Sequence, residues 1–218
     1  MLVGDWMYKS VTTVTEDVSM LRAGRIMREK KIRRLPVVDK AGRLIGIVSE
    51  RDLKAASPSS ATTLDMYEMT YLLAEMRIKN IMIKHPQSIR PTDTVERAAL
   101  IMRDRKVGCL PVVDEANTVV GIITDTDIFR LFVSITGIDR DGIQIGVRLA
   151  TCEGSLKPVL DILRSHDARI ISILSSYDRE KPACRDVSIR IQGLSETEEH
   201  ALKHALEQAS QVLYWTRD

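Results

Sequence analysis

Hydrophobic and polar positions follow the same order in two long stretches of the chain. Residues 7–53 align on residues 82–128 without a gap, at an offset of 75, and 17 of the 47 aligned positions are identical. Chance identity at average amino-acid usage would give about three. The densest match is LPVVD, at residues 35–39 and 110–114, followed in both stretches by Gly-Ile. The sequence therefore predicts two copies of one structural unit.

Each copy predicts the element order β-α-β-β-α. A short extended segment opens it, at residues 11–15 and 87–90. In the second copy, apolar residues at 95, 98, 99 and 102 then recur with the spacing of one helix face. LPVV and a β-branched run after a short turn predict a two-stranded hairpin. A second helix should begin at Ser49 and Thr124, and the two copies should pack on each other to bury their sheets.

Residues 57–60 (Ser-Pro-Ser-Ser) predict a break between the copies. Leu64, Tyr67, Tyr71 and Leu72 would then lie along one face of a connecting helix, which we expect to dock on the pair. Gly137 predicts the end of the last helix of the second copy. These signals divide the chain into repeat one (1–56), a helical linker (57–77), repeat two (78–137) and a third unit (138–218).

The third unit has a different pattern. Apolar residues alternate with polar ones at 143–150 and 187–191, which predicts half-buried strands, and further strands are expected at 170–175 and 212–216. Helical spacing lies between them, after residue 156 and after residue 195, and residues 178–182 predict a charged turn. The order β-α-β-β-α-β is ferredoxin-like. The fold class is thus α+β: a pair of β-α-β-β-α repeats followed by a β-α-β-β-α-β domain.

Composition narrows the class of protein. Of 218 residues, 44% are hydrophobic and 28% charged, which is typical of a globular protein, and only 4% are aromatic, so the core should be aliphatic. We expect no membrane span, no signal peptide and, at a net charge of +2, no nucleic-acid partner. Cys109, Cys152 and Cys184 are odd in number and lack CxxC spacing, which favours a reducing cytoplasm over disulfides or a zinc site.

Sequence strings typical of catalysis are absent: there is no GxGxxG, GxxxxGK[ST], HExxH or GxSxG. His200 and His204 have a spacing that could hold a metal, but charged neighbours favour a solvent-exposed helix face. Cys109 and a distant His85 are the only candidates for a nucleophile and a base. We therefore expect neither an enzyme nor a metal site.

The two helix starts, Ser49-Glu50-Arg51-Asp52 and Thr124-Asp125-Thr126-Asp127, hold the main candidate chemistry. The S/T-x-x-D pattern can be a capping box, in which hydroxyl and carboxylate satisfy the free amides of the helix start. It can also serve a ligand, because a helix start attracts anions and a carboxylate can accept two vicinal hydroxyls. Capping and binding need not exclude each other.

The repeated LPVVD…GIVSERD and LPVVDEANTVVGIITDTD strings resemble a tandem CBS-domain pair, also called a Bateman module. The strand order of residues 138–218 and the turn Glu153-Gly154-Ser155-Leu156 resemble an ACT domain. Together they are similar to the acetoin-utilisation accessory (AcuB-like) family.

The resemblance implies nucleotide contacts. The helix-start hydroxyl would face a phosphate and the aspartate would hold a ribose diol. Extended segments would meet the base edge, although ordinary sheet pairing is the alternative, and the Leu-Pro pairs would form an apolar wall for the purine. The candidate binding residues are Thr12, Thr13, Arg33, Arg34, Leu35, Pro36, Ser49, Arg51, Asp52, Gln87, Ser88, Gly108, Cys109, Leu110, Pro111, Thr124, Asp125 and Asp127.

The two clefts differ in sequence. Before LPVV, repeat one has a basic run (Lys30, Lys31, Arg33 and Arg34), where repeat two has Arg105, Lys106, Gly108 and Cys109. Repeat one also has Arg51 where repeat two has Thr126. We therefore expect the first cleft to prefer a polyphosphate and the second a less charged adenosyl ligand. Alternatively, the basic run only complements the preceding helix dipole.

The resemblance also implies a role for the third unit. Glu153, Gly154, Ser155 and Leu156 stand where ACT domains bind amino acids, although Thr151-Cys152-Glu153-Gly154 departs from the usual Asp/Asn-x-x-Gly. The alternative is a domain that only dimerises.

We expect a cytoplasmic, homodimeric regulatory protein that senses adenine nucleotides (AMP, ADP or ATP) or S-adenosylmethionine and signals by a conformational shift. No cofactor is required, and an unidentified enzyme could be the regulated partner. The alternatives are a ligand-free assembly scaffold and an amino-acid sensor.

Overall fold

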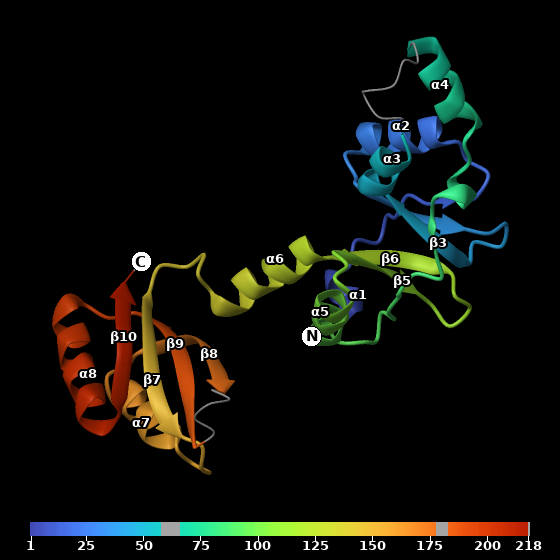
Figure 1. The fold of residues 1–218 in the computed structure, drawn as a ribbon. Coiled ribbons are helices and arrows are strands. Elements are labelled where there is room, and N and C mark those ends of the chain that lie inside the picture. The colour runs from blue at the N-terminus through green and yellow to red at the C-terminus, as the bar shows by residue number, and fades with distance from the viewer. Residues whose placement is uncertain (58–65, 178–182, 218) are drawn as a thin grey trace. The chain divides into compact units, whose positions relative to one another are not determined.

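The computed structural model describes residues 1–57, 66–177 and 183–217 (Figure 1). The chain forms two compact units, Met1–Ile128 and Phe129–Asp218, and each is described by itself. In the described residues, no helix has both the length and the hydrophobicity needed to cross a membrane.

The first unit contains the two repeats. Their elements follow the same order and differ chiefly in the helices that come before and between them. The elements are α1 (Val3–Trp6), β1 (Val14–Thr15), α2 (Met20–Lys30), β2 (Arg34–Val38), β3 (Leu44–Ser49), α3 (Glu50–Ala56), α4 (Met66–Glu75), the 3-10 helix η1 (Ile78–Asn80), β4 (Ile83–Lys84), α5 (Val95–Arg105), β5 (Cys109–Val113), β6 (Val119–Thr124) and the start of α6 (Asp125–Thr136).

Matching local signals give α2 and α5 the same length. Ser19 caps α2 by accepting a hydrogen bond from the Arg22 amide, and Thr94 caps α5 in the same way. Both helices end in a lysine with φ of 53°. A left-handed residue at this point stops the helix and turns the chain toward the next strand. The repeat expected from the sequence is thus present in the backbone.

Each repeat begins with an opening segment, residues 8–12 and 83–87, that crosses to the sheet of the other repeat, whereas the extended residues Val14 and Ile89 after it pair within their own repeat. Tyr8 forms an antiparallel bridge with Ile122, and β4 pairs antiparallel with β3, where Ile83 lies opposite Ile47. These two pairings are equivalent under the 75-residue offset. The first sheet therefore has the order β1-β2-β3-β4, in which β4 follows the linker, and β5 and β6 form the second. This exchange joins the repeats through backbone hydrogen bonds.

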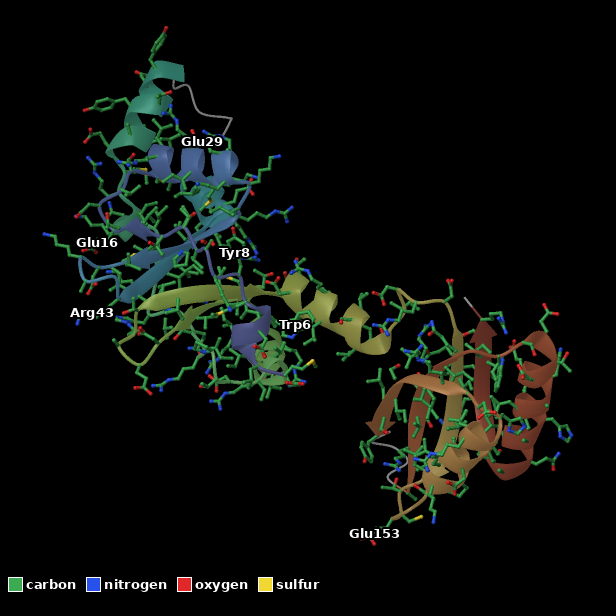
Figure 2. The ribbon with its side chains drawn as sticks, turned by 180° about the vertical axis from the view of Figure 1, so that it is seen from behind. Trp6, Tyr8, Glu16, Glu29, Arg43 and Glu153 are labelled. Atoms are coloured by element: carbon green, nitrogen blue, oxygen red, sulfur yellow. The ribbon has the colours of Figure 1, made fainter. Side chains whose placement is uncertain are left out.

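The repeats also meet at their hairpin turns. Arg43, which lies at a hairpin tip in Figure 2, forms a bridge with Thr118. The Leu44 amide donates to the Asn117 carbonyl over 2.9 Å, and the Asn117 side chain donates to the Leu44 carbonyl over 3.0 Å. The cores beneath both sheets are aliphatic, as the composition predicted, with Leu35 and Leu110 at 0% exposure.

Helix α4 corrects one expectation. Tyr67 and Tyr71 are 87% and 67% exposed and Leu72 is 40% exposed, so the face on which they lie does not dock. Leu73, with Met76 just after the helix, packs on the core of repeat one instead. Spacing alone favoured the tyrosines, but the opposite face carries aliphatic side chains that fit an aliphatic core. Leu64 lies outside the described residues.

The second unit contains the rest of α6, then β7 (Ile143–Ala150), α7 (Lys157–Ser165), β8 (Arg169–Tyr177), β9 (Cys184–Gln192), α8 (Glu196–Ala209) and β10 (Gln211–Arg217). Its sheet has the order β10-β7-β9-β8, with every neighbouring pair antiparallel. This is the ferredoxin-like arrangement that the alternation predicted. The expected turn at 178–182 lies outside the described residues.

One face of this sheet forms the core of the unit with both helices. Val159 and Leu163 of α7 and Leu202 and Leu206 of α8 pack on alternate residues of β7 and β9. As expected, Gly137 ends α6: its φ is 65° and its amide donates to the Val133 carbonyl over 3.1 Å. The boundary between the two compact units falls within α6, at Ile128.

Candidate functional site

Both helix starts form complete capping boxes. The Asp52 amide donates to Ser49 Oγ over 3.3 Å, and Asp52 Oδ2 accepts from the Ser49 amide at 2.7 Å and from Ser49 Oγ at 2.6 Å. Thr124 and Asp127 repeat this arrangement with distances of 3.3, 2.9 and 2.7 Å. The capping interpretation is therefore confirmed in both repeats, and it leaves room for a second role at Asp52. Its other oxygen, Oδ1, has no hydrogen bond to a described residue.

A cavity of about 690 Å³ opens beside the first helix start, and we call it the Ser49 cavity. Repeat one supplies the helix start and the residues before β2, while repeat two supplies the segment after β4 and the residues before and within β5. The lining residues are Arg33, Arg34, Ile47, Ser49, Glu50, Arg51, Asp52, Ile83, His85, Pro86, Gln87, Lys106, Val107, Gly108, Cys109 and Pro111.

A second cavity of about 540 Å³ opens beside the other helix start, and we call it the Thr124 cavity. It combines the start of α6 with the N-terminal segment of repeat one, where Figure 2 labels Tyr8, and with the end of α2 and the residues after it. The lining residues are Tyr8, Ser10, Val11, Thr12, Lys30, Lys31, Ile32, Arg33, Arg34, Ile122, Thr124, Asp125 and Thr126.

The cavities combine the repeats differently from the expected clefts. We expected Gly108 and Cys109 in the second cleft, but both line the Ser49 cavity. The physical reason is the exchange of opening segments, which sets each helix start against the other repeat. An internal alignment reveals that two units exist, but it contains no information about which parts of them meet.

The expected charge difference between the clefts also changes. Arg33 and Arg34 line both cavities, and Lys30 and Lys31 line only the Thr124 cavity. The basic run therefore does not belong to the first cleft alone, and both cavities can attract an anion. Arg51 and Lys106 are basic residues particular to the Ser49 cavity.

Six candidate residues line neither cavity. Leu35 and Leu110 are fully buried in the cores, so they cannot form an exposed wall for a purine. Pro36 and its equivalent Pro111 are both buried, and of the two only Pro111 lines a cavity, the Ser49 cavity. The others are Thr13, Ser88 and Asp127, the last of them 7% exposed.

Several lining residues were not identified from the sequence. Tyr8, Ser10 and Val11 enter the Thr124 cavity, and His85 and Pro86 enter the Ser49 cavity, because the opening segments cross between repeats. His85 has a φ of 49°, so the chain turns sharply there. The one sequence signal for these residues was that positions 8 and 83 are equivalent under the repeat offset. That equivalence does not show that either position lines a cavity.

In the wall of the Ser49 cavity, Gly108 and Cys109 lie beside two charged side chains, Arg34 and Asp125. A Cβ atom added at Gly108 would lie 2.6 Å from Arg34 Nη2 and 2.8 Å from Asp125 Oδ2, so these charged groups occupy the space a side chain would need. Burial raises the pKa of the Cys109 thiol to about 11; Arg34 acts to lower this pKa and Asp125 to raise it. The thiol is protonated at neutral pH and suits a wall better than a nucleophile.

The acidic residues that follow the two caps have different partners. Glu50 pairs with Lys54 on its own helix at 2.8 Å. Its equivalent Asp125 accepts a hydrogen bond from the Thr126 amide over 2.8 Å. A carboxylate of the protein thus occupies an amide at the start of α6, at a place where a bound anion would otherwise accept a hydrogen bond.

The loop between β7 and α7 holds the four candidate residues of the third unit. Glu153 and Gly154 are exposed, and Figure 2 shows Glu153 pointing away from its unit. Gly154 has a φ of 74°, and Ser155 Oγ accepts a hydrogen bond from Arg185 over 3.2 Å. Within the described residues, no group of three or more His, Cys, Asp or Glu side chains could hold a metal ion. His200 and His204 are therefore not part of such a group.

Comparison with known sequences identifies the repeats. A family model described as the CBS domain matches residues 3–59 and 78–134. A CBS domain-containing protein of Dictyostelium discoideum is 33% identical over 134 residues, which are 62% of this chain and 92% of that protein. A homoserine O-acetyltransferase of Methanohalobium evestigatum is 33% identical over 129 residues, 59% of this chain but 24% of that enzyme. The chain thus spans about a quarter of the enzyme's length.

Solved structures show the same fold. The CBS domain pair of protein MJ0100, in complex with 5′-methylthioadenosine and S-adenosyl-L-methionine, is 30% identical with a TM-score of 0.51, covering 61% of this chain and 95% of that one. CBSX2 in complex with AMP is 30% identical with a TM-score of 0.51, covering 62% and 98%. A candidate acetoin utilization protein (AcuB) of Vibrio cholerae is 32% identical with a TM-score of 0.53, covering 64% and 95%.

Proposed function

The chain belongs to the CBS domain family, and from this premise we propose that it is a regulatory protein that senses an adenosyl ligand in its two cavities. The observation that carries the proposal is the composition of each cavity, in which a capped helix start of one repeat faces the opening segment of the other. The MJ0100 pair and CBSX2, which bind adenosyl compounds, support the class of ligand.

The Ser49 cavity offers suitable groups for each part of a nucleotide. Asp52 Oδ1 can accept hydrogen bonds from ribose hydroxyls. Arg34 and Arg51 can pair with phosphate, which arginine binds through two parallel hydrogen bonds. Apolar atoms of Pro111 can cover one face of a purine. AMP, ADP, ATP and S-adenosylmethionine are the proposed effectors, and the protein itself needs no cofactor for this role.

Signalling would follow from the way the cavities are built. A ligand that contacts both repeats stabilises one packing of the repeats in proportion to its differential affinity for that packing. Helix α6 starts at the Thr124 cavity and continues into the second unit, so it is the proposed route to residues 138–218.

We assign residues 138–218 to an ACT-like domain, supported by its strand order. The proposed division is repeat one (1–56), linker (57–77), repeat two (78–137) and this domain. The proposal also includes a cytoplasmic setting, a homodimer and a link to acetoin utilization. Three free cysteines are in keeping with the cytoplasmic setting. The AcuB likeness supports the link to acetoin utilization. Amino-acid binding at the Glu153 loop and a ligand-free scaffold are the rival functions.

Calorimetric titration of the full chain with AMP, ATP and S-adenosylmethionine tests the proposal. We expect at least one of them to bind, and Asp52→Ala to weaken binding at the Ser49 cavity. Asp104→Ala is the matched control, because Asp104 is exposed on α5 and lines neither cavity. Failure of the wild-type chain to bind any adenosyl ligand would favour the scaffold, and binding of an amino acid alone would favour the ACT-based sensor.

A further inference from the structure

The cations that the two cavities share come from one repeat. Arg33 and Arg34 are the residues that line both cavities. Their equivalents 75 positions later are Gly108 and Cys109, which are uncharged at neutral pH and line the Ser49 cavity alone. The two cavities are therefore built from equivalent segments, but they share two cations from repeat one, and the equivalent positions of repeat two carry no cation.

Arg34 lies near Asp125, a carboxylate that lines the Thr124 cavity. Its Nη2 and Asp125 Oδ2 would both be in contact with a Cβ at Gly108, so the guanidinium and the carboxylate lie against the same glycine. Asp125 is held in place by its hydrogen bond from the Thr126 amide. Arg34 is half-buried and forms no hydrogen bond or ion pair within 4.0 Å to another described residue, so its long side chain can turn to either cavity.

We infer that Arg34 couples the two cavities, so that a phosphate-bearing ligand in the Ser49 cavity weakens the binding of a second such ligand in the Thr124 cavity. The inference rests on the proposed function. One guanidinium can pair bidentately with only one phosphate at a time. When Arg34 turns into the Ser49 cavity, its positive charge also moves away from Asp125, and that carboxylate then repels a phosphate in the Thr124 cavity more strongly.

The coupling discriminates between ligand classes. An adenosyl ligand without phosphate does not need Arg34, so its affinity for the Thr124 cavity should be independent of what fills the Ser49 cavity. Because coupling between sites is reciprocal, a phosphate in the Thr124 cavity weakens binding in the Ser49 cavity by the same factor. The favoured doubly occupied state thus holds one phosphorylated and one unphosphorylated ligand.

The test compares AMP binding to one cavity and to both by calorimetry on the full chain. Thr12→Trp fills part of the Thr124 cavity and Asp52→Ala impairs the Ser49 site, so each variant reports the affinity of the other site alone. We expect the second AMP to bind the wild-type chain about fivefold or more weakly than the single-site values predict, within the usual range of coupling. In Arg34→Gln the two AMP molecules should bind independently.

Two controls isolate Arg34. Arg51→Gln, which changes a cation of the Ser49 cavity alone, should weaken AMP binding there but keep the coupling factor. Adenosine as the second ligand should show no coupling to bound AMP. Arg34→Lys keeps the charge without the planar fork and should give an intermediate factor, which provides a second variant should Arg34→Gln fold poorly.

The possible outcomes are distinct. Independent binding of two AMP molecules to the wild-type chain overturns the inference, and so does a coupling factor that is unchanged in both Arg34 variants. If the wild-type chain binds one AMP, Arg34→Gln should bind two, and one AMP in each would also overturn it. Absence of any adenosyl binding to the wild-type chain would instead remove the proposed function, before an Arg34 variant is measured.

Discussion

The two helix starts of the first unit have the same cap and different surroundings. Ser49 with Asp52 and Thr124 with Asp127 form equivalent hydrogen bonds within a few tenths of an ångström. The next residue differs, because Glu50 pairs with a lysine one turn along α3, whereas the shorter Asp125 reaches the neighbouring amide. The comparison teaches that the repeated residues set the backbone, while the residues between them set the charge that a ligand meets.

The largest expected effect tests whether the repeats fold as one unit. Leu35 and Leu110 are equivalent and fully buried, so Leu35→Ala and Leu110→Ala should each lower the free energy of unfolding by about 2–5 kcal/mol. Because backbone bonds join the repeats, urea unfolding of residues 1–137 should show one transition in both variants. Two separate transitions, or a large loss in only one variant, would show that the repeats are not equivalent.

The caps give the next effect. Asp52→Ala should weaken nucleotide binding by about 1–3 kcal/mol, the cost of losing hydrogen bonds to a charged group, whereas Asp127→Ala, at a residue that lines neither cavity, should weaken it less. Thermal melts should show a smaller loss of stability, about 1 kcal/mol for a helix cap. A large fall in melting temperature with unchanged affinity would mean that these residues cap their helices and do not bind a ligand.

Cys109 should give repeat two a pH-dependent contribution to stability that repeat one lacks, because the equivalent residue in repeat one is Arg34. Burial raises the pKa of its thiol to about 11 from 9.0, so the folded chain holds this proton more tightly than the unfolded chain. The resulting stability is fully present below about pH 9 and is lost as pH rises toward 11, by about 1–3 kcal/mol. Urea unfolding across this range checks it, and Cys109→Ala should lack this part of the decline.

The hairpin turns give the smallest effect. Gly42 and Asn117 are equivalent and both have positive φ, 80° and 64°. Gly42→Ala should cost about 1 kcal/mol because alanine is strained there, and Gly42→Asn should cost less. Asn117→Gly should lose only the hydrogen bond to the Leu44 carbonyl. Equal costs for Gly42→Ala and Gly42→Asn in thermal melts would contradict the argument from backbone conformation.

The alternation and repeat patterns predicted most of the fold. They indicated both repeats and the element order of the second unit, because burial on one face of a strand or helix leaves a period in the sequence, and the low aromatic content indicated the aliphatic cores. The same method failed for α4, where two faces compete and only the packing of Leu73 against repeat one decides between them.

The sequence by itself determined part of the local structure: the caps at Ser49 and Thr124, the helix end at Gly137, and the existence of two equivalent helix starts. Only the tertiary structure decided that the opening segments cross, that Gly108 and Cys109 line the same cavity as Ser49, and that Arg34 lines both cavities. The physical reason is range. Caps and turns depend on residues a few positions apart, whereas the cavities depend on contacts between strands that are about 40 to 115 residues apart in the chain.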